Sequence, residues 1–137
     1  MKLVQLASLI LFSALMVNGS CKKKTPTPNP PTPPPAEQNI VFTHNAGNNV
    51  FNPGASLNFA VTLTSTMPAS GIKVEISTVQ ELSGAAVSSS SASGSTAVVN
   101  VSVTGLIQQV WCVTTIKVSS VATPTNSATQ TFRVVYK

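Results

Sequence analysis

The stretch that decides the fold is Leu57-Asn58-Phe59-Ala60-Val61-Thr62-Leu63-Thr64. Its large apolar side chains alternate with polar or small ones, and a period of two is typical of a β-strand that buries one face. Apolar positions on a helix recur every three to four residues instead. Residues 57–64 are therefore predicted to form a half-buried strand.

The same alternation recurs on both sides of this stretch. It is found in residues 72–77, 97–103 and 131–136, and a short first strand is expected around residues 40–42. Turn residues separate these runs, at positions 52–54, 68–71, 93–95 and 124–126. Because no stretch carries a helical stripe of useful length, residues 37–137 are predicted to form one all-β domain, an antiparallel β-sandwich of about seven strands.

Two stretches of this predicted domain resemble a known family. Residues 53–61, Pro-Gly-Ala-Ser-Leu-Asn-Phe-Ala-Val, look like the approach to the second strand of many bacterial immunoglobulin-like modules. Residues 126–134, Asn-Ser-Ala-Thr-Gln-Thr-Phe-Arg-Val, are similar to the closing strand of PKD-type and fibronectin-type-III-like repeats. The resemblance implies an immunoglobulin-like sandwich, whereas residues 80–96 match no pattern of that family.

Serine dominates residues 88–95, which read Ser-Ser-Ser-Ser-Ala-Ser-Gly-Ser. Clusters of serine and glycine between periodic segments are typical of loops. We therefore expect a solvated connection between two strands, and a hydroxyl-rich adhesive edge is the alternative.

The first 20 residues have the layout of a secretory signal. Lys2 gives a positive start, residues 3–17 are mostly apolar, and small or polar residues precede Cys21. Crossing a bilayer takes about 20 apolar residues, and residues 3–17 are fewer. Residues 1–20 are therefore predicted to be a signal peptide and not a transmembrane anchor.

Cys21, followed by Lys22, Lys23 and Lys24, resembles the cleavage region of Bacteroidota-type bacterial lipoproteins. The resemblance implies that Cys21 becomes a multiply acylated N-terminus, and two or more acyl chains bind a membrane stably where one binds marginally. Asn18 stands where such signals usually carry an aliphatic residue. An ordinary signal peptide that leaves Cys21 a plain thiol is therefore the alternative.

Residues 21–36 are expected to link this anchor to the domain. Residues 25–35 hold seven prolines in eleven positions, a composition that favours a polyproline II spacer of roughly 34 Å. In the lipoprotein family, Asp after the cysteine retains the protein at the inner membrane, so Lys22 implies the outer membrane. The lack of acidic residues before Glu37 favours its periplasmic leaflet over the cell surface.

The net charge of +5 lies mostly outside the predicted domain. From position 37 onward the charged residues are Lys73, Lys117, Arg133, Lys137, Glu37, Glu75 and Glu81, so four cations minus three anions give +1. A nucleic-acid binder needs a clustered basic face. No nucleic-acid partner is therefore predicted.

Few residues could carry catalysis or hold a metal. Cys112 and the single histidine, His44, would be the members of a thiol dyad, but no signature of an orienting group or an oxyanion hole accompanies them. We expect Cys112 to be a small buried residue and His44 to be a solvated residue at the end of the first strand. The chain has no Asp and three scattered Glu, so we predict no metal site, no cofactor and no enzymatic activity.

Trp111 lies in the strand-forming residues 110–121, where two arrangements are open. Strict alternation turns Cys112 and Thr114 inward and Trp111 outward, whereas a one-residue bulge at positions 114–115 turns Trp111 inward. Immunoglobulin-like cores often contain one large aromatic ring, and a buried indole needs only a partner for its N–H. We therefore predict a buried Trp111.

Two functions are compatible with these features. The first is a non-catalytic lipoprotein, tethered to the membrane, whose immunoglobulin-like module contacts an envelope protein or supports an envelope assembly. The second is a glycan-binding or adhesive lipoprotein that uses an exposed Trp111 and an uncharged polar face. The residues expected on that face are Asn58, Thr62, Thr64, Asn100, Ser102 and Thr104.

Overall fold

A computed structural model describes residues 35–137, and these contain no helix that could cross a membrane. The predicted signal peptide at 1–20, the predicted lipidation site Cys21 and residues 22–34 of the linker lie outside the described residues.

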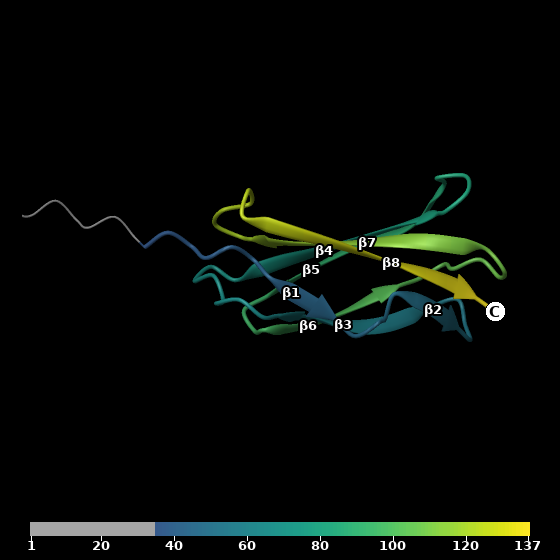
Figure 1. Cartoon of the computed structure of the whole chain (residues 1–137), viewed down its shortest axis with the longest axis horizontal. Coiled ribbons are helices and arrows are strands. Elements are labelled where there is room, and N and C mark those ends of the chain that lie inside the picture. Colours follow the sequence, from purple (N-terminus) through teal and green to yellow (C-terminus); the bar gives the residue numbers. More distant parts are fainter. Residues whose placement is uncertain (1–34) are drawn as a thin grey trace, which may run out of the picture. The chain divides into compact units, whose positions relative to one another are not determined.

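The described residues fold into two β-sheets. Their strands are β1 (Phe42–His44), β2 (Asn49–Asn52), β3 (Leu57–Leu63), β4 (Ile72–Gln80), β5 (Ala86–Gly94), β6 (Val98–Val103), β7 (Trp111–Ser120) and β8 (Ser127–Tyr136). One sheet has the order β1-β3-β6 and the other β2-β8-β7-β4-β5 (Figure 1). All neighbours are antiparallel except β2 and β8. The predicted immunoglobulin-like β-sandwich is confirmed.

The inner faces of the two sheets form one apolar core. In β3 the predicted alternation holds, because Phe59, Val61 and Leu63 are buried. Phe42 and Phe132 are among the largest fully buried side chains. Burial of one such side chain contributes about 1.5–3 kcal/mol relative to leaving it exposed, so the core holds the two sheets together.

The first strand, expected around residues 40–42, is β1 at 42–44, and an unexpected short strand, β2, follows it in the other sheet. β1 pairs with β3, the chain bends, and β2 then pairs with β8. Gly47 in the bend has a φ of 85°, which favours glycine. Asn45 stabilises the bend, because its Oδ1 accepts a hydrogen bond from the Ala60 N–H at 2.8 Å. With β2 and the serine-rich β5, neither of which the alternation indicated, the described residues form eight strands where about seven were predicted.

The serine-rich segment is a strand, so the expected solvated connection is wrong. β5 pairs antiparallel with β4 along its length and forms one edge of the five-stranded sheet. The hairpin between β4 and β5 turns through Gly84, whose φ is 70°. Serine repeats carry no apolar alternation to reveal a strand, and the hydrogen-bond ladder with β4 defines it instead.

The start of the domain is fastened to the turn between β7 and β8. The Ile40 N–H donates to Asn126 Oδ1 at 3.1 Å, and Asn126 Nδ2 donates to the Gln38 carbonyl at 2.9 Å. The Ser120 hydroxyl donates to the Glu37 carboxylate at 3.0 Å. We call the end of the domain that contains these hydrogen bonds the N-terminal end. The opposite end, where the C-terminus lies, is the C-terminal end (Figure 1).

Candidate functional site

Trp111 lies half-buried on the outer face of the five-stranded sheet, so the expectation of a buried indole is wrong. β7 keeps an unbroken register with both β4 and β8, and the expected bulge is absent. Cys112, Thr114 and Ile116 therefore point into the core. Strict alternation buries the Thr114 hydroxyl, and its hydrogen bond with Thr78 Oγ1 at 3.0 Å satisfies that polar group.

The outer face around Trp111 carries a cluster of aromatic and cationic side chains, formed by Phe51, Trp111, Arg133, Val135 and Lys137. Val135 lies directly opposite both Phe51 and Trp111. It is only 6% exposed, although it is not part of the core between the sheets. The two rings meet edge to face with their centroids 5.4 Å apart. Such a pair is worth about 0.5–1.5 kcal/mol beyond the area it buries.

Two cations lie over the two rings of this cluster. The Arg133 guanidinium carbon is 4.6 Å from the indole centroid, and Lys137 Nζ is 4.2 Å from the centroid of Phe51. Arg133 also forms an ion pair with Glu81. Cation–π contacts and ion pairs at exposed sites contribute at most about 1 kcal/mol each. Each of these cationic contacts therefore contributes less to the stability of the fold than the burial of one core side chain does.

A pocket of about 370 Å³ opens beside Trp111. Its lining residues are Gln80, Glu81, Leu82, Gln109, Val110 and Trp111. Gln109 adopts a left-handed backbone with a φ of 61°, and its N–H donates to the Tyr136 carbonyl at 2.7 Å. The loop before β7 is thus fixed to the end of β8, and the pocket has a defined wall.

Three exposed apolar side chains lie around the same end of the domain, while Val41, Val98 and Val121 are exposed elsewhere on the described surface. Leu82, on the β4–β5 hairpin, is fully exposed, Phe51 is 57% exposed and Ile107 is 45% exposed. Phe51 contacts the Trp111 ring and Leu82 lines the pocket beside it, and apolar side chains that adjoin one another mark interaction sites more often than scattered single residues do.

The cluster and the N-terminal end lie at opposite ends of β7. Trp111 begins this strand, and Ser120, which bonds Glu37, ends it. At about 3.4 Å per residue, the two ends are about 30 Å apart. Figure 1 shows the start of the described chain and the C-terminus at opposite ends of the sandwich.

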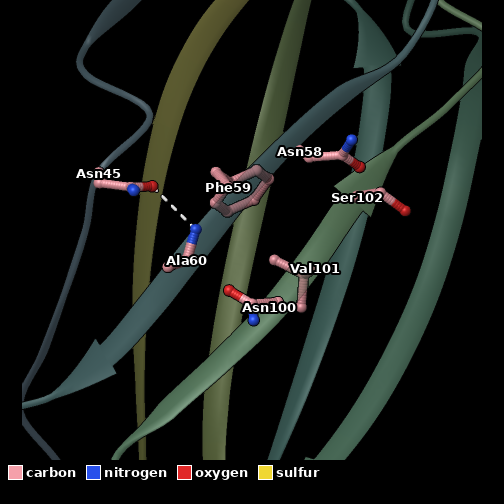
Figure 2. A pocket seen from close by; sticks show the side chains of 7 residues that line it. All are labelled: Asn45, Asn58, Phe59, Ala60, Asn100, Val101 and Ser102. Carbon is pink, nitrogen blue, oxygen red and sulfur yellow. Dashed lines mark hydrogen bonds between the residues drawn. The ribbon is translucent and has the colours of Figure 1, made fainter.

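A second hollow, of about 420 Å³, lies on the outer face of the three-stranded sheet (Figure 2). Its uncharged side chains include Asn45, Asn58, Asn100 and Ser102, grouped around the small Ala60. Asn58, Asn100 and Ser102 lie on this outer face as the alternation predicts.

The polar face and Trp111 belong to different sheets and face opposite sides of the sandwich. The core between the sheets separates them. They cannot form the single glycan platform that the sequence allowed.

His44 and Cys112 show no sign of acting as a catalytic pair. The buried Cys112 thiol donates to the Val110 carbonyl, with 3.7 Å between sulfur and oxygen. His44 packs against Phe59 and Phe132, with ring centroids 6.4 and 5.2 Å away, and its buried Nδ1 has no hydrogen-bond partner among residues 35–137. His44 ends the first strand as expected, but it is half-buried and not solvated. Burial lowers the pKa of His44 and raises the pKa of the Cys112 thiol, which disfavours a reactive thiolate.

Sequence reasoning singled out Trp111 but did not predict that the other members of the cluster lie beside it. Arg133, Val135 and Lys137 alternate along the C-terminal segment, and that spacing alone places them on one face. Phe51 joins them only through the parallel pairing of β2 with β8, for which the sequence carries no signal.

Comparisons with family models, with curated proteins and with solved structures found no match. Within residues 35–137, no group of three His, Cys, Asp or Glu side chains is placed to hold a metal ion.

Proposed function

We propose that this chain is a non-catalytic lipoprotein whose immunoglobulin-like domain contacts another protein of the cell envelope. Cys21 carries the acyl chains, and residues 22–36 serve as the spacer. The cluster around Trp111 makes the contact. The anchor lies in the periplasmic leaflet of the outer membrane.

The separation between the two ends of the domain carries this proposal. The N-terminal end is held by hydrogen bonds within the chain, whereas the C-terminal end presents Trp111, Arg133 and the exposed Leu82. Trp and Arg are enriched among the residues that dominate protein–protein affinity. A tether joined at the N-terminal end leaves the C-terminal end accessible to a partner.

The position of Arg133 favours a protein partner over a glycan. A sugar ring that stacks on an indole needs a free ring face. The guanidinium lies over the Trp111 ring at 4.6 Å, and the indole is already half-buried. The hollow on the three-stranded sheet is lined by uncharged polar side chains, Ala60 and the largely buried Phe59 and Val101, so it presents no exposed aromatic ring.

Photo-crosslinking in living cells tests this contact. A photoreactive amino acid is placed at Leu82, at the C-terminal end, and in a second strain at Val121, an exposed position beside the N-terminal end. We expect a protein adduct from Leu82 that is absent from Val121 and lost on Trp111→Ala. Equal adducts from both positions would contradict the proposal. An adduct that glycosidases remove would identify a glycan partner instead.

The anchor is tested separately with Cys21→Ala. We expect this variant to lose labelling by radioactive palmitate and to leave the membrane fraction. Unchanged labelling or unchanged fractionation would overturn lipidation at Cys21. Protease added to intact cells should leave the domain uncut, and cleavage there would place it on the cell surface.

A further inference from the structure

β5 is an edge strand whose outward backbone groups have no partner strand. Within residues 35–137 it pairs only with β4, and it ends the order of the five-stranded sheet. Among the described residues, no backbone hydrogen bond outside that ladder involves β5. The alternating N–H and C=O groups along its free side match another extended backbone.

β5 also lacks the features that usually keep an edge strand from pairing. Its nine residues read Ala-Val-Ser-Ser-Ser-Ser-Ala-Ser-Gly, with no proline and no charge. Its register with β4 is regular from Ser88 to Gly94, and the one irregularity lies near the hairpin. Natural edges are commonly protected by lysine, proline or a bulge, so an unprotected edge of this length suggests that it is used.

The nearest strand of the other sheet does not form a ladder with this edge. β6 approaches β5 through side chains, because Ser90 Oγ donates to the Ser102 carbonyl at 3.3 Å. A Cβ added to Gly94 would lie 2.8 Å from Val99 Cγ2, so the close approach depends on small residues in β5. No backbone pairing joins β5 to β6, and the free side of β5 stays available.

We propose that β5 pairs with β5 of a second copy of this chain, antiparallel about a twofold axis. Residues directly opposite each other share a face of a sheet, so the axis passes through a residue and not between two. With the axis at Ser90, Ser89 lies opposite Ser91 and Ser88 lies opposite Ala92. These pairs are small and uncharged, so the two edges meet without a clash or like charges. The paired sheets form one continuous sheet, in which five strands plus five give ten.

A second copy fits this edge better than an unrelated extended peptide. Peptides added to a sheet edge are selected by side-chain pockets, and β5 itself carries no charge and no side chain larger than valine. The strand instead complements itself in length and side-chain size, as a twofold interface requires. This pairing does not involve the cluster around Trp111, so it stands or fails independently of the proposed partner contact.

Charge-swapped variants test the pairing. One chain carries Ser89→Lys with Ser91→Lys, and the other carries Ser89→Glu with Ser91→Glu, both at exposed positions. Each variant alone sets two like-charged pairs across the axis, which should raise its dissociation constant by about tenfold. An equimolar mixture sets Lys opposite Glu and should restore dimers. Sedimentation is measured on the full chain with Cys21→Ala, so that acyl chains cannot drive association, and the unsubstituted edge should sediment as a dimer.

A matched control substitutes exposed residues of β8, which lies three strands from β5 in the same sheet. Thr129→Lys with Thr131→Lys adds the same charge away from the proposed interface and should leave the dimer intact. Circular dichroism confirms that every variant is folded. The proposal is overturned if the unsubstituted protein sediments as a monomer at all concentrations. It is also overturned if the edge variants dimerise as well as the control, or if mixing them restores nothing.

Discussion

The two ends of the sandwich use their side chains in different ways. At the N-terminal end, Asn126, Ser120 and Glu37 hydrogen bond to one another or to nearby backbone. At the C-terminal end, Trp111 and Arg133 lie on the outer face beside exposed apolar residues. Side chains at the first end thus stabilise the domain, and those at the second end are the ones that the proposed partner would contact.

The largest loss of stability is expected at the N-terminal end. Asn126→Ala removes the acceptor for the Ile40 N–H and the donor to Gln38 and Glu37. At about 0.5–1.5 kcal/mol per hydrogen bond, unfolding should become easier by about 2 kcal/mol. Urea unfolding followed by Trp111 fluorescence measures this change, with Asn58→Ala at an exposed strand position as the control. Equal urea midpoints for Asn126→Ala and Asn58→Ala would show that the hydrogen bonds of Asn126 do not stabilise the domain.

Trp111→Ala is expected to lose less stability than Asn126→Ala but to lose binding to the proposed partner. The variant removes the contact with Phe51 and the cation–π contact with Arg133, so we expect about 1–2 kcal/mol of destabilisation. The adduct from position 82 should fall at least about tenfold, which corresponds to about 1.4 kcal/mol of binding. An unchanged adduct from a folded Trp111→Ala protein would break the comparison between the two ends.

Arg133→Gln should separate binding from stability more sharply. It removes an exposed cation and its pairing with Glu81, so the free energy of unfolding should change by less than about 1 kcal/mol. The adduct from position 82 should still weaken, because interfacial arginines often contribute strongly to binding. If Arg133→Gln lowers the free energy of unfolding but leaves the adduct from position 82 unchanged, Arg133 stabilises the fold and does not contribute to binding.

The smallest effect on stability is expected from a drop in pH, and it arises from His44, which belongs to neither end. Burial lowers the pKa of His44 in the folded protein, while the unfolded chain titrates near its ordinary value of about 6.5. The unfolded state therefore takes up the proton first, and stability should fall as the pH drops below about 6.5. Urea midpoints at about pH 7.5 and about pH 5.5 measure this slope. His44→Gln should flatten it, and an unchanged slope in that variant would assign the acid sensitivity to other groups.

Local pattern predicted the fold, whereas the surface cluster depends on pairing between distant segments. Alternation around Phe59 and Val61 reports burial directly, because one face of a strand meets the core. β5 was not predicted as a strand because its residues, mostly serine, show no alternation between apolar and polar side chains. Trp111 was placed on the wrong face because the Thr78–Thr114 hydrogen bond, which makes a buried threonine acceptable, joins residues that are 36 positions apart.

Thiol labelling in native membranes tests the central claim most directly. Leu82→Cys and Val121→Cys each add one accessible thiol to the full chain, while Cys112 is buried and the proposed acylation blocks Cys21. We predict that a maleimide labels position 82 at least about tenfold more slowly in native membranes than in purified protein, because a partner covers the C-terminal end. Position 121 should react equally fast in both preparations. Equal rates at position 82 in both preparations would contradict the account.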